Sequence, residues 1–350
     1  MNVTEIIKER LHNQQLIHNR YRKPFEIITW LGALQGQDYY GAKWAVGLRL
    51  PGITDAELER AFADKTIFRT WLMRGTLHLV AAKDIRWMLK LLAPRIIESN
   101  KRRYRELELD EKTLNHSNQV LRTALVDEKE LNRRELMTIL QENGISTEGQ
   151  RAAYMLQRAS LDGFICQCAV DHNNPIYMSM DPLPKSKSME RDVALAELAR
   201  CYFKSRGPAT IGDFIWWSGL LAADAKAGLE AVKSDLIPEK VGNQIYWHYE
   251  TIEEMQDIST IAHLLPTYDE YLFGYKDRSA AINSPNKIKL RNRYRSTIAI
   301  NGQIMGTWKR KLEKNSVIIE YNLFKTLNRT ENQALTEAKL HYTKFLNIPN

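Results

Sequence analysis

The chain has 350 residues, of which 44% are hydrophobic and 9% aromatic, so it is long enough to bury packed cores in two to four domains. Lysine and arginine outnumber aspartate and glutamate by 50 to 42, a modest excess for this length. Where the basic residues cluster is therefore more informative than their total. No apolar run approaches the length of a transmembrane helix, which excludes a helical membrane protein.

The cysteines and the first residues predict an intracellular location. Cys166, Cys168 and Cys201 are an odd number of cysteines without the spacing of a disulfide framework, which is typical of a reducing compartment. Residues 1–10 are polar and charged, so we expect no signal peptide. A soluble cytoplasmic protein is the expectation.

An apolar pattern near the N-terminus is interrupted by a glutamine. Residues 5–22 predict an amphipathic helix, and a second helix is expected to begin at Pro24, which suits a first helical position. Ile28, Leu31 and Gln35 then fall at i, i+3 and i+7 on one inward face. A neutral amide on such a face needs hydrogen-bond partners or a wet cleft.

A glycine between two glutamines is expected to end this second helix. If the chain leaves helical geometry at Gly36, the side chains of Gln35 and Gln37 can point into the same space, which positions two apart on one helix cannot do. A plainer interpretation stays open, in which Gln35 is a hydrogen-bonded core amide and Gln37 lies in solvent.

Three segments repeat the order helix, turn, helix, β-hairpin. In the first, Thr54 and Glu57 form a capping box for a helix that precedes a hairpin over residues 67–80. The second and third occupy residues 132–180 and 192–249. This order is typical of winged-helix units, in which the second helix commonly enters a groove of DNA.

From residue 261 the sequence becomes aromatic and turn-rich. Segments 296–300 and 303–311 predict a hairpin about an Asn-Gly turn, a strand over residues 316–323 follows, and a closing helix is expected over residues 331–346. These strands suggest a small β-barrel. The expected fold is therefore α+β: three tandem winged-helix units, each a helix-turn-helix plus β-hairpin, and then a C-terminal β-barrel. The predicted domains are residues 1–106, 107–188 and 189–257 for the three winged-helix units, and 258–350 for the barrel with its closing helix.

Three basic clusters indicate a nucleic-acid partner. They occupy residues 101–105, 287–295 and 309–311. The second is the most informative, because its cations alternate with two aliphatic residues and a tyrosine in a predicted loop, which suits phosphate contact and stacking. A solvated charged face explains any one cluster equally well. Three clusters together with three helix-turn-helix units favour nucleic acid.

Sequence motifs for metal and nucleotide chemistry are missing. Cys166 and Cys168 would share one face of a strand, and with His172 they form at most a partial site, without further ligands at zinc spacing. The sequence has no phosphate-binding loop, dinucleotide fingerprint or nucleophile elbow. We therefore expect neither a metal nor a cofactor.

Two further polar positions receive structural interpretations. Asp269 and Glu270 lie in an apolar, turn-rich segment, where a carboxylate pair more often anchors backbone groups or Arg278 than acts as an acid or base. His78, on the first predicted hairpin, is expected to be packed or hydrogen-bonded, although a catalytic role stays open.

Several stretches together resemble the AlkZ-like DNA glycosylases, a bacterial family of tandem winged-helix proteins closed by a β-barrel. These stretches are residues 34–38, 69–79, 206–210, 213–214, 217–219, 264–278 and 301–308, which extend nearly from end to end. The catalytic element of the best-known branch is a Gln-x-Gln pair, with Gln-x-Asp in a sister branch, and Gln35 and Gln37 match the first. The intervening residue, usually aliphatic in the family, is Gly36 here, which could loosen the loop.

The resemblance implies a monofunctional, cofactor-free DNA glycosylase that releases N-alkylated purines and, in some members, unhooks interstrand crosslinks. Gln35 and Gln37 are then the candidate catalytic residues. The implied partner is double-stranded DNA containing alkylated bases, bound by a monomer associated with the bacterial nucleoid. The candidate DNA-binding residues are Arg69, Arg74, His78, Lys287, Lys289, Arg291, Arg293, Arg295, Lys309 and Arg310.

Two amides suit this chemistry for a physical reason. A purine alkylated at N7 or N3 is cationic and already a good leaving group, so it needs little acid catalysis. Glutamine oxygens can hold the water that approaches C1′ and can face the positive charge that develops on the sugar. The rival interpretation is a non-catalytic winged-helix regulator, which would bind undamaged sequences and would need no amide pair. A lyase is disfavoured, because no lysine stands out as a Schiff-base nucleophile.

Overall fold

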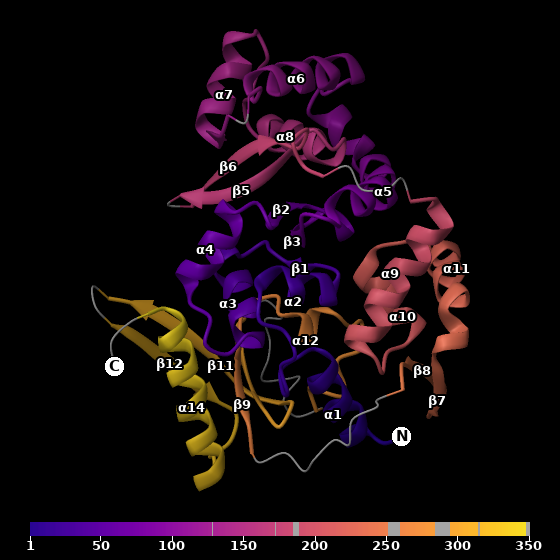
Figure 1. Ribbon diagram of the computed structural model, residues 1–350, viewed down its shortest axis with the longest axis vertical. Coiled ribbons are helices and arrows are strands. Elements are labelled where there is room, and N and C mark those ends of the chain that lie inside the picture. Colours follow the sequence, from indigo (N-terminus) through magenta and orange to yellow (C-terminus); the bar gives the residue numbers. More distant parts are fainter. Residues whose placement is uncertain are drawn as a thin grey trace. The chain divides into compact units, whose positions relative to one another are not determined.

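A computed structural model describes residues 1–127, 129–171, 173–184, 189–250, 260–283, 295–313 and 316–347. The chain forms two compact units, one of which is inserted into the sequence of the other (Figure 1). The discontinuous unit comprises Met1–Leu58 and Leu195–Asn350, and the inserted unit comprises Glu59–Ala194. The N-terminal helices therefore share a unit with the C-terminal part of the chain.

The inserted unit is built on an antiparallel sheet covered by helices. Its strands are β2 (Ile67–Trp71), β3 (Leu77–Ala81), β4 (Leu131–Asn132), β5 (Ile165–Asp171) and β6 (Asn174–Ser179), which lie side by side in the order β3-β2-β5-β6-β4. The two hairpins of this unit meet where Arg69 lies opposite Gln167. The first and second predicted repeats therefore contribute to one sheet.

Among the described residues, four α-helices complete the inserted unit, and another leads into it. They are α5 (Ile85–Glu106), α6 (Glu111–Ala124), α7 (Arg133–Glu142) and α8 (Arg151–Leu161), preceded by α4 (Asp55–Ala63). Leu121, Leu136 and Met155 are fully buried in the core that these helices form with the sheet. The beginning of α7 was predicted correctly: the Oδ1 of Asn132 accepts from the backbone N–H of Glu135 at 3.1 Å, and the Glu135 carboxylate accepts from the N–H of Asn132.

The discontinuous unit combines helices from both ends of the chain with two small sheets. Its helices are α1 (Val3–Asn13), α2 (Pro24–Leu31), α3 (Tyr39–Arg49), α9 (Arg191–Arg206), α10 (Ile211–Ser218), α11 (Ala222–Val232), α12 (Glu270–Phe273) and α14 (Arg329–Phe345). Its strands are β1 (Leu34–Gln35), β7 (Ile237–Val241), β8 (Gln244–His248), β9 (Ala262–Leu265), β10 (Thr297–Ile300), β11 (Gln303–Leu312) and β12 (Val317–Leu323).

The predicted C-terminal β-barrel is wrong, because the described strands form an open sheet. The four strands lie in the order β12-β11-β10-β9, and no pairing joins β9 to β12 within the described ranges. Barrels that close around a side-chain core usually need more strands than this. Helix α14 packs against β9 and β10 instead. The ring centroid of Tyr342 lies there 4.8 Å from that of Trp44 and 5.2 Å from that of Trp308. The helix thus buries the apolar face that closure of a barrel would have buried.

Two helix ends near the N-terminus differ from the sequence-based prediction. Helix α1 ends at Asn13 rather than at residue 22, and α2 ends at Leu31 rather than at the glycine between the glutamines. Gly32 ends α2 because it adopts a left-handed conformation with φ of +74°, which is unfavourable for residues with a Cβ atom. The glutamines therefore lie beyond the helix, in the segment that connects α2 to α3.

The repeated order of helix, helix and hairpin is present in the structure. It appears as α3-α4-β2-β3, as α7-α8-β5-β6 and as α10-α11-β7-β8. The Thr54–Glu57 capping box of α4 was also predicted, and Thr54 Oγ1 and N–H both donate to the Glu57 carboxylate at 2.8 Å. In the part of the chain that the structure describes, no helix combines the length and the apolar character needed to cross a membrane.

Candidate active site

The two glutamines lie in the connection between α2 and α3. After Gly32 the chain enters the short strand β1, which ends at Gln35. Asp38 then caps α3, and its Oδ1 accepts a hydrogen bond from the backbone N–H of Gly41 at 3.1 Å. Gln35 is half-buried and Gln37 is exposed. We call residues 31–38 the glutamine loop.

The side-chain oxygen of Gln35 is buried and has no hydrogen-bond partner among the described residues. A buried acceptor left in this condition costs about 1–3 kcal/mol, so native structures contain few of them. Such groups call for a specific explanation, and a place for a bound water or ligand is one.

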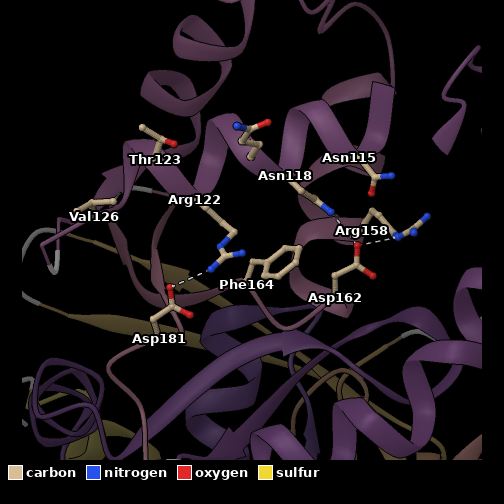
Figure 2. A pocket seen from close by; sticks show the side chains of 10 residues that line it. Asn115, Asn118, Arg122, Thr123, Val126, Arg158, Asp162, Phe164 and Asp181 are labelled. Atoms are coloured by element: carbon tan, nitrogen blue, oxygen red, sulfur yellow. Dashed lines mark hydrogen bonds and ion pairs between the residues drawn. The ribbon is translucent and has the colours of Figure 1, made fainter. Parts of the chain in front are cut away.

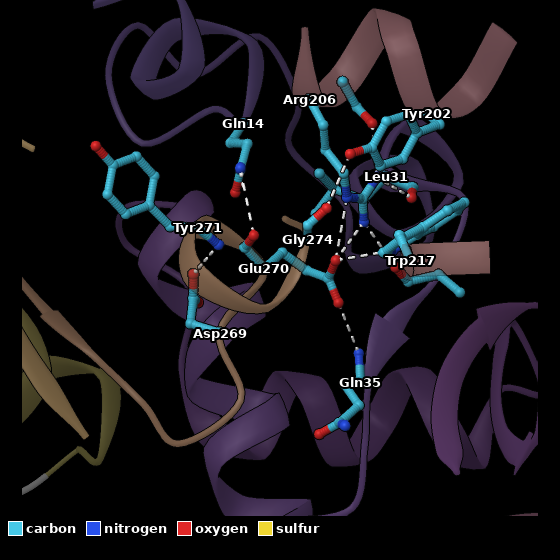
Figure 3. A network of polar contacts seen from close by, with 12 residues as sticks. Gln14, Leu31, Gln35, Tyr202, Arg206, Trp217, Asp269, Glu270, Tyr271 and Gly274 are labelled. Atoms are coloured by element: carbon cyan, nitrogen blue, oxygen red, sulfur yellow. Dashed lines mark hydrogen bonds and ion pairs between the residues drawn. The ribbon is translucent and has the colours of Figure 1, made fainter. Parts of the chain in front are cut away.

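A buried ion pair fixes the backbone of the glutamine loop (Figure 3). Arg206, at the end of α9, is 0% exposed, and Glu270, at the start of α12, is 2% exposed. The Arg206 Nη2 and Nε atoms donate to the Glu270 Oε2 at 2.7 and 3.1 Å. The other carboxylate oxygen, Oε1, accepts from the backbone N–H of Gln35 at 3.1 Å.

The same guanidinium group also binds backbone carbonyls within the loop. Arg206 Nη1 donates to the carbonyl oxygen of Leu31 at 2.7 Å, and its Nη2 donates to that of Ala33 at 3.2 Å. The indole N–H of Trp217 donates to the Glu270 Oε2 at 3.0 Å. The ion pair thus binds the loop backbone at three residues, and charge-assisted bonds of this kind are among the stronger hydrogen bonds in proteins.

A second buried ion pair lies directly beside the first. Asp269 accepts hydrogen bonds from Arg49 Nη1 and Nη2 at 2.8 and 2.9 Å, and Arg49 also donates to the side-chain oxygen of Gln14 at 3.1 Å. The prediction was that the Asp269-Glu270 pair anchors backbone groups or Arg278, and its bonds from the backbone N–H groups of Gln35 and Tyr271 agree with the first of these. The Arg278 Nε donates to the carbonyl oxygen of Leu272 at 2.7 Å.

One tyrosine hydroxyl connects the two ion pairs. Gln14 donates to the hydroxyl of Tyr275 at 2.9 Å, and that hydroxyl donates to the carbonyl oxygen of Arg206 at 2.8 Å. Burial raises the pKa of Tyr275 above its usual value. The phenol therefore keeps the proton with which it donates to Arg206.

Two of the predicted DNA-binding residues are buried in the inserted unit. Arg69 is 6% exposed, and its Nη1 donates to the side-chain oxygen of Gln167 at 2.7 Å. His78 is 0% exposed, and its Nδ1 lies 2.9 Å from the carbonyl oxygen of Thr76. Packing of His78 was expected, and burial speaks against a direct phosphate contact for either side chain. Arg74 is half-buried at the β2–β3 turn, with φ of +58°.

The other predicted DNA-binding residues belong to the C-terminal basic segments. Lys287, Lys289, Arg291 and Arg293 lie outside the described residues. Arg295 and Lys309 are exposed. Arg310 is half-buried, with its guanidinium 5.5 Å from the ring centroid of Tyr40 and bonded to the Tyr342 hydroxyl.

The cysteine pair of β5 is buried. Cys166 and Cys168 are buried thiols, and burial raises the pKa of Cys166 well above its usual value and that of Cys168 to about 12. Both thiols therefore keep their protons at neutral pH. Among the residues with described positions, no three His, Cys, Asp or Glu side chains gather as a metal site. His172 lies outside the described residues.

The inserted unit contains a polar pocket of about 670 Å³ that holds none of the predicted site residues (Figure 2). Its charged side chains are paired with one another. Arg158 Nε and Asn118 Nδ2 both donate to the Asp162 carboxylate at 2.8 Å, and Arg122 lies 3.7 Å from Asp181. Arg122 also stacks on the Phe164 ring, 4.7 Å from its centroid.

Comparisons with known proteins match the chain over nearly its whole length. The family model for DNA glycosylase AlkZ-like proteins matches residues 28–345, which include the glutamine loop, Arg206 and Glu270. The chain belongs to the AlkZ-like DNA glycosylase family.

A relative and a solved structure extend this result. A Streptomyces sahachiroi protein named interstrand DNA cross-link repair glycosylase is 24% identical over an alignment of 335 residues, which covers 87% of this chain and 86% of the relative. The structure of the DNA glycosylase AlkZ from the same organism superposes with a TM-score of 0.80 at 19% sequence identity. The match covers 99% of this chain and 97% of that one, and it shows that the fold is shared.

Membership in the AlkZ-like family makes the chain a DNA glycosylase, a hydrolase that acts on N-glycosyl bonds. The resemblance drawn from the sequence motifs is confirmed. The sequence had indicated Gln35 and Gln37 and an anchoring role for the Asp269-Glu270 pair, but it gave no role to Arg206 and did not connect Glu270 with the glutamines. The signal for these two residues was their place in matching stretches, beside Gly207-Pro208 and beside Asp269.

Proposed function

We propose that this AlkZ-like glycosylase hydrolyses the N-glycosidic bond of purines alkylated at N7 or N3, including bulky adducts and interstrand crosslinks. One observation carries the proposal. Gln35 has a buried amide oxygen without a partner among the described residues, on a loop whose backbone one buried ion pair binds at three residues. A polar group held in this way is a candidate to bind the water or sugar of the reaction.

The two glutamines are proposed to act on the attacking water and on the charged sugar. In the reaction, the bond from C1′ to the purine nitrogen breaks, its electron pair neutralises the cationic base, and water oxygen bonds to C1′ and releases a proton. The amide oxygens of Gln35 and Gln37 accept hydrogen bonds from this water and stabilise the oxocarbenium-like transition state. Amides are weak bases, so only destabilised bonds such as those of cationic purines are cleaved.

The proposal also includes an arrangement in winged-helix units and a set of DNA-binding residues. Three winged-helix units at residues 1–106, 107–188 and 189–257 precede a C-terminal sheet unit at residues 258–350. A monomer binds double-stranded DNA through Arg74, Arg295, Lys309, Arg310 and the 287–293 segment. Neither metal nor cofactor takes part. Burial of Arg69 and His78 makes them supports of the β2–β3 hairpin in this scheme.

The crosslink part of the proposal has its support in the relative from Streptomyces sahachiroi, whose name states interstrand cross-link repair. Crosslinked and bulky bases cannot enter a tight pocket that receives one flipped base. The exposed position of Gln37 is consistent with chemistry at an open surface.

Release of free base from modified DNA tests the proposed function. Purified protein is incubated with duplex DNA containing N7-methylguanine, and free base is measured by chromatography beside undamaged DNA of the same sequence. We expect free N7-methylguanine and an abasic strand that stays intact until alkali is added, with the same yield after exhaustive EDTA treatment. Absence of free base, with tight binding to a preferred undamaged sequence, would support the regulator instead.

A crosslinked duplex provides the second substrate. Unhooking of an N7-guanine interstrand crosslink converts the slow-migrating duplex to single strands on a denaturing gel. If N7-methylguanine is released but the crosslink persists, the substrate range is limited to simple adducts and the crosslink part of the proposal is wrong.

A further inference from the structure

We propose that the Arg206–Glu270 ion pair is a positioning device for Gln35, and that Glu270 sets the rate of base excision without touching DNA. This inference rests on the proposed function, because it assigns to Gln35 a part in the chemical step. It concerns residues that come from α9 and α12, far from the glutamine loop in the sequence.

The two oxygens of the Glu270 carboxylate have different partners. Oε2 accepts from Arg206 Nε, Arg206 Nη2 and the Trp217 indole at 2.7–3.1 Å. Oε1 accepts from the backbone N–H of Gln35 at 3.1 Å. In Figure 3 the side chain of Gln35 extends away from this carboxylate, so Glu270 holds the backbone and leaves the amide side chain to other contacts.

The packing around the pair leaves little room for adjustment. The Arg206 guanidinium lies 4.4 Å from the ring centroid of Trp217. A Cβ atom on Gly274 would lie 2.6 Å from the carbonyl oxygen of Glu270 and 3.2 Å from the Arg206 side chain. The guanidinium is therefore closely packed, and its two hydrogen bonds together with that of Trp217 hold the Oε2 of the carboxylate in place, as a positioning residue requires.

Retention of a buried ion pair calls for an explanation other than stability. Replacing such a pair with apolar groups is often neutral or stabilising, because desolvation offsets the attraction. Here the atoms of the pair also form hydrogen bonds with the backbone N–H of Gln35 and the backbone carbonyls of Leu31 and Ala33. Catalysis is sensitive to displacements of about 1 Å, which can cost on the order of 10² in rate. These contacts indicate that the ion pair positions the glutamine loop.

The substitution Glu270→Gln tests this role with almost no change in shape. Three donors converge on the Oε2 position, so the new amide oxygen must occupy it. The new NH₂ group then faces the N–H of Gln35, and two donors repel each other. We expect the single-turnover excision rate to fall by about 10–10²-fold, with the dissociation constant for DNA changed less than about threefold.

Asp269→Asn is the matched control. It also converts a buried, arginine-paired carboxylate to an amide, but Asp269 accepts from Arg49 and from the N–H of Tyr271, both of which lie outside the glutamine loop. We expect its excision rate to stay within about threefold of the wild type at a temperature where both variants are folded. Equal rate reductions in the two variants would overturn the positioning role.

A double-variant comparison separates positioning from general destabilisation. If Glu270 acts through Gln35, then Glu270→Gln should cost no further rate in a Gln35→Ala background, whereas independent effects would multiply. A wild-type rate for Gln35→Ala would defeat the catalytic assignment itself. A slow Gln35→Ala variant beside a fast Glu270→Gln variant would defeat only the present inference.

A measurement on the unmodified protein keeps the inference testable if Glu270→Gln fails to fold. The backbone N–H of Gln35 donates to a carboxylate that is 2% exposed, so its hydrogen exchange should be as slow as that of core amides. Exchange at the rate of an open loop would show that Glu270 does not hold Gln35 in solution.

Discussion

Two polar networks in this molecule use the same kinds of side chain in opposite surroundings. In the network of the glutamine loop, Arg206 and Glu270 are 0% and 2% exposed, and their bonds reach the loop backbone (Figure 3). In the pocket of the inserted unit, Arg122 and Asp181 lie 3.7 Å apart with 50% and 64% of their side chains in solvent (Figure 2).

The difference lies in what each network can hold in place. An exposed ion pair contributes about 0–1 kcal/mol, and salt screens it. A buried pair has lost its hydration, so each partner depends on the other, and removing one leaves an uncompensated charge. Such a network therefore fixes a loop only where water is excluded. Variants of the buried and the exposed network test this difference.

The largest contrast is expected in stability. Arg206→Ala leaves the Glu270 carboxylate buried without its cation, and we expect the free energy of unfolding to fall by about 3–5 kcal/mol. Arg122→Ala removes the exposed partner of Asp181, and we expect a reduction of about 0–1 kcal/mol. Urea unfolding followed by tryptophan fluorescence measures both, since Trp217 lies against Arg206. Equal reductions in the two variants would mean that burial does not distinguish the networks.

The next contrast concerns catalysis and compares two buried amides. Gln35 Oε1 and Asn118 Oδ1 both lack a partner among the described residues, but only Gln35 lies on the loop fixed by the ion pair. We expect Gln35→Ala and Gln37→Ala each to slow single-turnover release of N7-methylguanine by on the order of 10²–10³. DNA affinity should change little, because neither amide carries charge. Asn118→Ala should excise at the wild-type rate.

Two substitutions at Gln37 refine this test. Gln37→Asp resembles the Gln-x-Asp sister branch and should keep part of the activity, since a carboxylate can also hold the water. Gln37→Leu has similar bulk without an acceptor and should keep little. Wild-type excision by the alanine variants would make the glutamines structural.

The sequence predicted the local features of the site better than its long-range contacts. Amphipathic spacing and capping boxes depend on residues a few positions apart, so most helices and hairpins could be predicted directly. Gln35 was expected on the face of the second helix, but it lies beyond the end of α2, in β1. The hydrogen bond between Gln35 and Glu270 joins residues 235 positions apart, and that between Arg206 and Glu270 joins residues 64 apart. No local pattern specifies such pairs.

The lack of a local pattern for long-range contacts also explains why the β-barrel prediction was wrong and why the DNA-binding role of Arg69 lost support. Closure of the C-terminal sheet depends on how α14 packs against β9, which the strand patterns do not specify. Arg69 was considered a surface cation because of its charge, but it lies on β2, between β3 and β5 in the sheet, where it binds Gln167. Charge predicts exposure only where the topology leaves a face open.

A smaller effect is expected in the pH dependence of stability. Burial lowers the pKa of His263 to about 4, although its ring also donates to the carbonyl oxygen of Leu16 at 2.9 Å. The folded state therefore keeps this ring neutral at pH values where the unfolded chain, with a pKa near 6.5, binds a proton. The contribution is fully present above about pH 6.5 and is lost as pH falls toward 4, by up to about 1.4 kcal/mol per pH unit.

Substitution isolates this histidine from other titrating groups. His263→Gln keeps a side-chain donor without a titrating ring, so its stability should fall less steeply than that of the wild type between pH 6.5 and 4. Parallel slopes for the wild type and His263→Gln would show that the ring titrates normally and is reached by water.

The smallest effect is expected for DNA binding by the exposed cations, which differ from the buried arginines in being free to leave their places without uncovering a charge. Lys309 is exposed on β11, so its ammonium group can reach a phosphate without any buried charge being uncovered. We expect Lys309→Ala to weaken binding to DNA of any sequence and to flatten the plot of log Kd against log salt concentration by about 0.9. Neutralising Lys289, Arg291 and Arg293 together should flatten it by about 0.9 for each phosphate that is no longer neutralised.

Arg122 provides the control. It is also exposed but is paired with Asp181 and stacked on Phe164, so Arg122→Ala should leave the slope unchanged. An unchanged slope for Lys309→Ala, measured by fluorescence anisotropy between about 50 and 200 mM salt, would show that this strand faces away from DNA.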